Sequence, residues 1–104
     1  MLLAAGAIIG AAANDGATPL YIAVQCGHTN VVRALLAAGA NVEAARDSGA
    51  RPLHAASYQD RFVAAMLLLD AGAAVNALTN DGHSPLAYAT TPAMRALLAA
   101  RGGV

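Results

Sequence analysis

The stretch Gly-Ala-Thr-Pro-Leu-Tyr at residues 16–21 decides the fold, because the chain repeats it. It returns as Gly-Ala-Arg-Pro-Leu-His at 49–54 and as Gly-His-Ser-Pro-Leu-Ala at 82–87, with the prolines 33 residues apart. A second motif, Leu-Leu-x-Ala-Gly-Ala, keeps the same spacing at residues 2–7, 35–40 and 68–73. A fixed period in this range indicates stacked copies of one supersecondary unit.

The start of each unit favours a turn followed by a helix. Asn-Asp-Gly at residues 14–16 is a turn signal, since Gly accepts a positive φ. Thr18 can accept a backbone N–H as the helix N-cap, and Pro19 suits the first helical position. Apolar residues follow at helical spacing, and we expect the helix to end at Gly27.

A second helix should follow in each unit. In the first complete unit, Thr29 or Asn30 can provide its N-cap, and Gly39 its end. Residues 41–43 are then expected to run extended toward the next turn. The two helices should lie antiparallel, and only stacking of neighbouring units can cover their apolar faces. The buried face of the second helix is expected to consist of Val31, Val32, Leu35 and Leu36.

Three groups of residues resemble a known repeat family. They are Gly-x-Thr-Pro-Leu at 16–20, Gly-His at 27–28 with Leu-Leu-x-x-Gly-Ala-Asn-Val at 35–42, and Pro-Leu-His-Ala-Ala at 52–56. Together they resemble the ankyrin repeat, whose signature is Thr-Pro-Leu-His-x-Ala. The resemblance covers nearly the whole chain. It implies an all-α ankyrin-repeat solenoid: about three stacked helix-turn-helix units joined by β-hairpin-like loops, with a partial N-terminal unit.

The period divides the chain into repeats of unequal completeness. The last unit lacks four residues between its helices, and Thr-Pro at 91–92 restarts a helix there. The N-terminal part lacks a first helix, so the chain is either a piece of a longer array, which we favour, or carries a makeshift cap. We expect a single domain over residues 1–104, with a partial repeat at 1–12, repeats at 13–45 and 46–78, and a shortened C-terminal capping repeat at 79–104.

The repeat at 46–78 departs from the pattern. Arg51 stands where Thr18 stands one unit earlier, so the hydroxyl cap is missing. Asp60 replaces Gly27 where a left-handed residue is expected, at a cost of about 1 kcal/mol. Met66 replaces Arg33 on the expected solvent face. These irregularities argue against an idealised consensus sequence.

Composition excludes several classes of partner. The formal net charge is zero and 12% of residues are charged, which argues against nucleic-acid binding. The apolar run at residues 1–13 is too short to span a bilayer, so no membrane partner is expected. Cys26 is the single cysteine, which excludes an internal disulfide and fits a reducing, intracellular compartment.

No constellation of residues points to catalysis, a metal or a cofactor. Asp15, Asp47 and Asp81 lie at the repeating turns, where Asp bonds its own backbone. Cys26 fits a half-buried small hydrophobe better than a reactive thiol. The resemblance implies that His54 bonds to the backbone and holds adjacent loops together, although Arg51 in place of a preceding Thr leaves part of that network in doubt. Phosphate-loop motifs are missing.

A partner-binding surface remains as the main prediction. The resemblance implies that partners bind the concave strip formed by the turn tips and the exposed side of the first helices. Tyr58 is the best anchor, because Tyr gives a large contact area at low entropic cost, and nearby arginines can pair with an acidic group. The predicted partner-binding residues are Asn14, Asp15, Gln25, Arg46, Asp47, Ser48, Arg51, Tyr58, Gln59, Asn80, Asp81 and His83.

The leading hypothesis is therefore a non-catalytic module that binds another protein through this strip. An alternative is a truncated segment of a larger regulatory or enzymatic protein with an intramolecular scaffolding role, which extension of the reading frame upstream would reveal. A third is an enzyme that acts through His54 or Cys26, and a thiol-reactivity assay that shows no activated Cys26 would remove its best version. Self-association through the uncapped N-terminal end is a further expectation.

Overall fold

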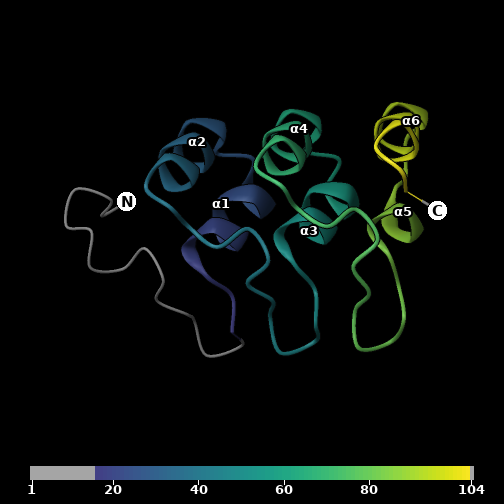
Figure 1. The fold of residues 1–104 in the computed structure, drawn as a ribbon, viewed down its shortest axis with the longest axis horizontal. Coiled ribbons are helices and arrows are strands. Elements are labelled where there is room, and N and C mark those ends of the chain that lie inside the picture. The colour runs from purple at the N-terminus through teal and green to yellow at the C-terminus, as the bar shows by residue number, and fades with distance from the viewer. Residues whose placement is uncertain (1–15, 104) are drawn as a thin grey trace.

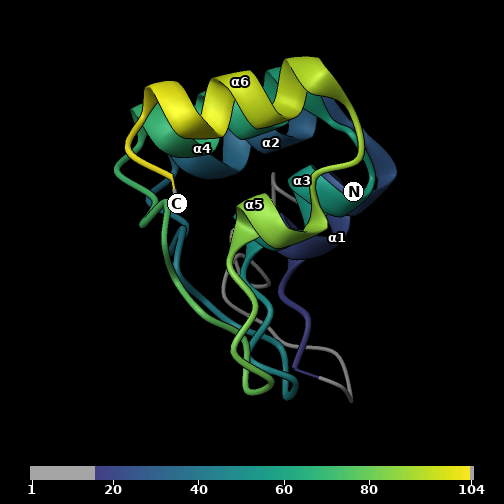
Figure 2. The same ribbon diagram turned by 90° about the vertical axis from the view of Figure 1, so that its right-hand side faces the viewer.

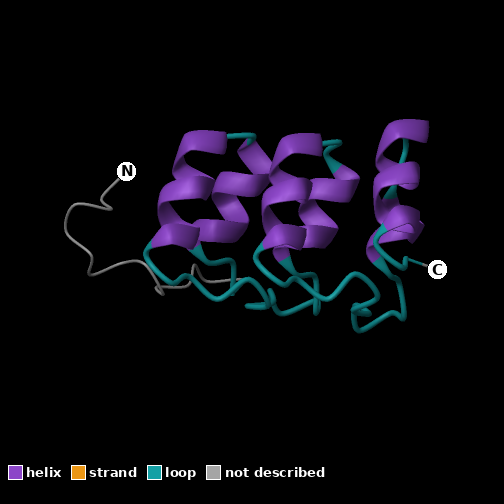
Figure 3. Ribbon diagram, turned by 45° about the horizontal axis from the view of Figure 1, so that its top comes forward, coloured by secondary structure: helices purple, strands orange, loops and turns teal. Residues whose placement is uncertain are grey.

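The computed structural model describes residues 16–103, which form α-helices in antiparallel pairs joined by loops (Figures 1 and 3). No strand occurs within this part of the chain. The predicted all-α repeat architecture is confirmed; the unit boundaries stay a prediction. The helices are α1 (Pro19–Cys26), α2 (Thr29–Ala37), α3 (Pro52–Tyr58), α4 (Phe62–Asp70), α5 (Pro85–Tyr88) and α6 (Pro92–Ala100).

The helices form two layers. Figure 2 shows α2, α4 and α6 stacked in one layer and α1, α3 and α5 in the other. Each helix packs against its own partner and against the corresponding helix of the next pair. The long loops project beyond the layer of α1, α3 and α5, so these helices and the loops form one continuous face.

A hydroxyl cap followed by a proline starts α1, α5 and α6, and the predicted caps of α1 and α6 are confirmed. Thr18 Oγ1 accepts the Tyr21 N–H at 3.3 Å, and Pro19 follows as the first residue of α1. Thr91 Oγ1 accepts the Met94 N–H at 3.2 Å at the start of α6. These bonds satisfy amide groups that have no partner within the helix.

The predicted cap of α2 is wrong. His28 is the N-cap and makes no side-chain capping bond, while Thr29 is already the first helical residue. The reason is the tight turn after α1, in which the Gly27 and His28 N–H groups bond the Val24 and Ala23 carbonyls. Only two residues separate the helices, so Thr29 must be helical.

Residues 41–43 do not run extended, contrary to expectation. Asn41 Oδ1 accepts the Glu43 N–H at 2.9 Å, and the Asn41 carbonyl accepts the Ala44 N–H at 3.3 Å. Asn readily forms such a turn with its own backbone. The chain therefore bends here before it enters the next loop.

The left-handed residue predicted in the second pair is confirmed at Asp60. Its φ is 57°, close to the 76° of Gly27 at the same place in the first pair. The Asp60 side chain also accepts a hydrogen bond from the Thr91 hydroxyl at 2.8 Å. Asp60 thus combines a strained backbone with a contact to the next unit.

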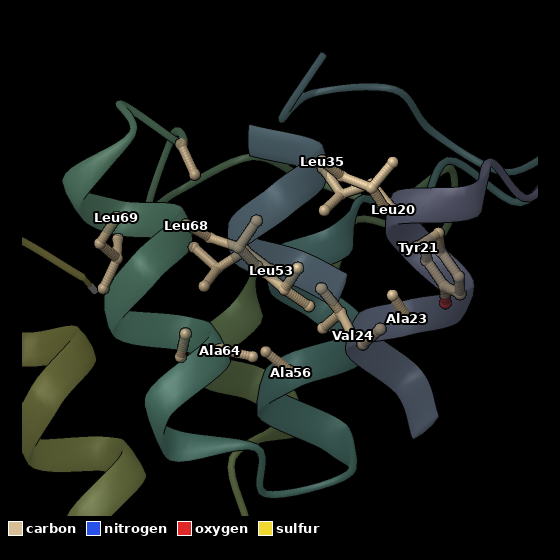
Figure 4. Close-up of a cluster of buried hydrophobic side chains, with 14 of the residues drawn as sticks. Leu20, Tyr21, Ala23, Val24, Leu35, Leu53, Ala56, Ala64, Leu68 and Leu69 are labelled. Carbon is tan, nitrogen blue, oxygen red and sulfur yellow. The ribbon is translucent and has the colours of Figure 1, made fainter. Parts of the chain in front are cut away.

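The core lies between the two layers and along the stack (Figure 4). The largest aliphatic side chains of the core, each at most 2% exposed, are Leu20, Leu35, Leu53, Leu68 and Leu98. Small buried residues such as Ala56 and Ala64 lie between them and let helices approach closely. Because alanine buries little apolar area, these few leucines carry much of the hydrophobic stabilisation.

The first prediction concerns the core. Leu53→Ala removes a side chain that is 2% exposed and should leave a cavity that lowers the free energy of unfolding by about 2–5 kcal/mol. Leu78→Ala is the matched control, since Leu78 is 59% exposed. Urea denaturation followed by circular dichroism measures both, and equal stability of the two variants would contradict the core assignment.

The second prediction isolates the backbone strain at Asp60. Asp60→Ala and Asp60→Gly both lose the bond to Thr91, but only Gly adopts a positive φ without steric cost. Asp60→Ala should therefore be less stable than Asp60→Gly by about 1 kcal/mol. Thermal or urea unfolding of the pair gives the difference, and a more stable Ala variant would show that the left-handed conformation is absent.

Candidate functional site

The tips of two successive loops are hydrogen-bonded to each other. Within each loop the ends close by backbone bonds, Arg46 N–H to the Ala50 carbonyl and Thr79 N–H to the His83 carbonyl, both at 2.9 Å. Between loops, Asn80 is the link: its side-chain amide donates to the Asp47 carbonyl at 2.8 Å and its backbone N–H donates to the Ser48 carbonyl at 2.9 Å. The loops therefore present a connected edge.

His54 joins the start of α3 to the following loop. Its Nδ1 accepts the Arg51 N–H at 3.0 Å, so the proton of the neutral ring lies on Nε2. Nε2 then donates to the carbonyls of Ala77 at 2.9 Å and His83 at 3.0 Å. The side chain is 2% exposed, and its bond to Arg51 compensates for the missing hydroxyl cap.

A groove of about 250 Å³ lies on the face made by the inner helices and the loops. It extends from α1 across α3 to α5, so it spans the stack. Its floor includes the methyl groups of Ala50 and Ala55 and the buried ring of His54. The groove is lined by Tyr21, Gln25, Arg46, Ser48, Ala50, His54, Ala55, Tyr58, Gln59 and Tyr88.

Aromatic rings gather at one end of the groove. The rings of Tyr58 and Tyr88 lie 6.0 Å apart at 87°, and that of Tyr88 also meets His54 at 5.9 Å and His83 at 5.6 Å. The Tyr58–Tyr88 and His54–Tyr88 pairs are edge-to-face, which favours a fixed mutual orientation, whereas the His83 ring is tilted by 59° to the Tyr88 ring. Tyr58 is 62% exposed while Tyr88 is half-buried beside it.

Tyr88 is the main lining residue that sequence reasoning missed. It lies three residues after Pro85, as the buried Ala55 lies three residues after Pro52. The 33-residue period aligns Tyr88 with Ala55 of the preceding unit. Because Ala55 is small and buried, this alignment gave no reason to expect Tyr88 on the exposed face. Only the structure shows that a large side chain here reaches the face.

The two arginines of the predicted site have different surroundings. The Arg46 guanidinium carbon lies 5.3 Å from the centre of the Tyr21 ring, in a cation–π arrangement. Arg51 is not among the lining residues; its guanidinium pairs with Glu43 Oε1 at 3.2 Å. Glu43 Oε2 also accepts the Ala74 N–H at 2.7 Å. Arg51 and Glu43 lie in the same loop, and the bond from Ala74 to Glu43 connects this loop to the next one.

Apart from Arg51, the predicted site residues separate into three groups. Gln25, Arg46, Ser48, Tyr58 and Gln59 line the groove. Asp47, Asn80, Asp81 and His83 are exposed at the loop tips, although the Asn80 amide is bonded to the neighbouring loop. Asn14 and Asp15 lie outside the described residues.

Three further observations concern a reactive thiol, a metal site and a membrane-spanning helix. Cys26 is exposed rather than half-buried, because it is the last residue of α1. Among residues 16–103, His, Cys, Asp and Glu side chains do not gather in groups of three or more that could hold a metal ion. None of the described helices is both long enough and apolar enough to cross a membrane.

Comparison with known protein families supports the repeat assignment. The family model described as ankyrin repeat matches residues 15–48. The model described as ankyrin repeats in many copies matches residues 35–89. A comparison with curated proteins found no match.

The third prediction follows from the environment of His54. Burial of the ring lowers its pKa, and the positive charge of Arg51 adds to this; the His83 and Ala77 carbonyls and the Glu43 carboxylate act in the opposite sense. Below the ordinary histidine pKa of about 6.5, the unfolded chain binds a proton that the folded chain does not. The stability contributed by neutral His54 should therefore be complete above that pH and fall as the pH drops toward the lowered pKa.

Urea unfolding at about pH 7.5 and about pH 5.5 measures this effect. We expect the wild type to lose stability at the lower pH and His54→Gln to lose less. His28→Gln, at an exposed histidine, should behave as the wild type. A wild type equally stable at both pH values would contradict the prediction.

Proposed function

The chain belongs to the ankyrin repeat family, and from this premise and the groove we propose that it is a non-catalytic module that binds another protein through its concave face. Ankyrin repeats are generally protein-interaction modules. The observation that carries the proposal is the groove, which crosses three inner helices and exposes Tyr58 over 62% of its surface. A large exposed aromatic side chain in a groove is typical of an interface anchor.

The rigidity of the face supports recognition without large rearrangement. His54 bonds the groove floor to the following loop, and Asn80 bonds one loop tip to the next. A surface ordered before binding loses less entropy when a partner docks. The proposed mechanism is therefore docking of a partner onto a preformed surface.

The geometry also favours binding over catalysis. Both ring nitrogens of His54 are engaged in structural bonds to backbone groups, so this residue cannot serve as a general base without breaking the link between units. The exposed Tyr and Gln side chains of the groove are contact residues rather than chemical groups.

The fourth prediction is a capture experiment from source-cell lysate, read by mass spectrometry. The double variant Tyr58→Ala/Gln59→Ala removes two groove side chains. We expect it to lose a protein that the wild type retains, by about tenfold or more, as for the loss of an interface anchor. The matched control is Arg33→Ala/Arg95→Ala, which changes exposed residues on the outer helices α2 and α6.

Circular dichroism confirms that all variants are folded before capture. A partner lost by the outer-helix control and retained by the groove variant would place binding on the outer layer and contradict the proposed face. Retention unchanged in both would exclude these side chains as anchors.

A further inference from the structure

We propose that the groove binds a proline-rich segment of its partner in an extended, polyproline-type conformation. The inference rests on the proposed function and specifies the partner's chemistry. A ligand must match three properties of the groove, namely its floor, its aromatic end and the hydrogen-bonding character of its rim.

The floor can contact only an apolar group. Ala50 and Ala55 contribute methyl groups, and His54 contributes a ring whose two nitrogens already bond to Arg51, Ala77 and His83. A polar ligand group placed there would lose its water without gaining a hydrogen bond, which is unfavourable. An apolar side chain therefore fits it better than a charged one.

The aromatic end provides flat surfaces at a right angle. The rings of Tyr58 and Tyr88, 87° apart in orientation and 6.0 Å between centres, form two walls of different direction. Grooves lined by aromatic residues bind polyproline helices, whose conformation is already ordered before binding. The flat proline ring packs on such walls with little loss of entropy.

The polar groups at the rim of the groove can donate hydrogen bonds to a ligand. Among the described lining residues, none is acidic and Arg46 alone carries a formal charge. The other polar rim groups, the hydroxyls of Ser48, Tyr58 and Tyr88 and the amides of Gln25 and Gln59, can all donate. A polyproline segment offers backbone carbonyls that lack internal partners and few N–H groups. The donors and acceptors of the two surfaces are therefore complementary.

The charge of the groove argues against a basic segment. A ligand Lys or Arg would find no carboxylate among the described lining residues and would lie near Arg46. An acidic segment is the competing occupant, because Arg46 could attract it. The two occupants differ in what they need: an acidic ligand depends on the Arg46 charge, whereas a proline-rich ligand depends on the Tyr58 and Tyr88 rings.

The test uses a phage-displayed library of random peptides selected on the immobilised wild-type chain of residues 1–104. The enriched peptides should contain more proline than the unselected library. A synthetic copy of an enriched peptide, carrying a fluorophore, should then bind Tyr58→Ala about tenfold or more weakly in fluorescence anisotropy. The outer-helix control Arg33→Ala should bind within about threefold of the wild type.

Tyr88→Ala should also weaken binding, but Tyr88 is half-buried and its variant could unfold. Tyr58 is 62% exposed, so Tyr58→Ala keeps the test valid in that case. Enriched peptides without excess proline that still require Tyr58 would overturn the proline inference and leave the proposed binding face intact. Peptides rich in Asp or Glu that lose affinity in Arg46→Gln would identify an acidic ligand instead.

Other results would count against the groove itself. Peptides that bind Tyr58→Ala as tightly as the wild type would overturn both the inference and the proposed face. A wild-type chain that enriches no peptide overturns the inference. Sedimentation that shows Tyr58-dependent self-association would assign the groove to a second copy of the chain.

Discussion

The hydrogen bonds of the His54 ring are the interaction on which the arrangement of the second and third helix pairs depends. One nitrogen is bonded to the chain just before α3, and the other to two carbonyls at either end of the following loop segment, Ala77 and His83. The ring is buried, and its nitrogens would cost free energy there without partners. The His83 carbonyl also accepts the Thr79 N–H that closes the loop. The ring therefore connects the start of α3 to both ends of the loop that leads into α5, the helix whose Tyr88 lines the groove.

Polar contacts elsewhere along the stack also join neighbouring units. Asn80 bonds to Asp47, Thr91 to Asp60, and Arg101 to Asp70 at 2.9 Å, each pair joining residues 31 or 33 positions apart. An exposed bond of this kind contributes little alone. Alanine-rich interfaces, however, have smooth apolar surfaces that do little to prevent neighbouring units from sliding past each other. The directional bonds supply the register that the small side chains do not.

Sequence reasoning succeeded where a local rule decides the structure. The period of 33 residues predicted the stacked helix pairs, Thr18 and Thr91 predicted helix starts, and the place of Asp60 in the repeat predicted its positive φ. It failed at the α1–α2 turn, where the length of the connection overrides the capping preference of Thr29. The same applies to Tyr88, whose approach to Tyr58 depends on how two helices of different length stack. The period locates a residue within its unit, but side-chain contacts across units depend on packing.

The two ends of the groove differ because the last inner helix is short and ends in an aromatic residue. α5 has 4 residues and ends at Tyr88, whereas α1 has 8. At the position of Tyr88 the preceding unit has Ala55, which is 5% exposed and forms part of the floor. The junction between α1 and α3 therefore provides Tyr21 beneath Arg46, and the junction between α3 and α5 provides the perpendicular tyrosines. A chain of identical units would present the same surface at each junction. Here the irregular last unit makes the two ends of the groove chemically different, which gives a bound segment a preferred direction.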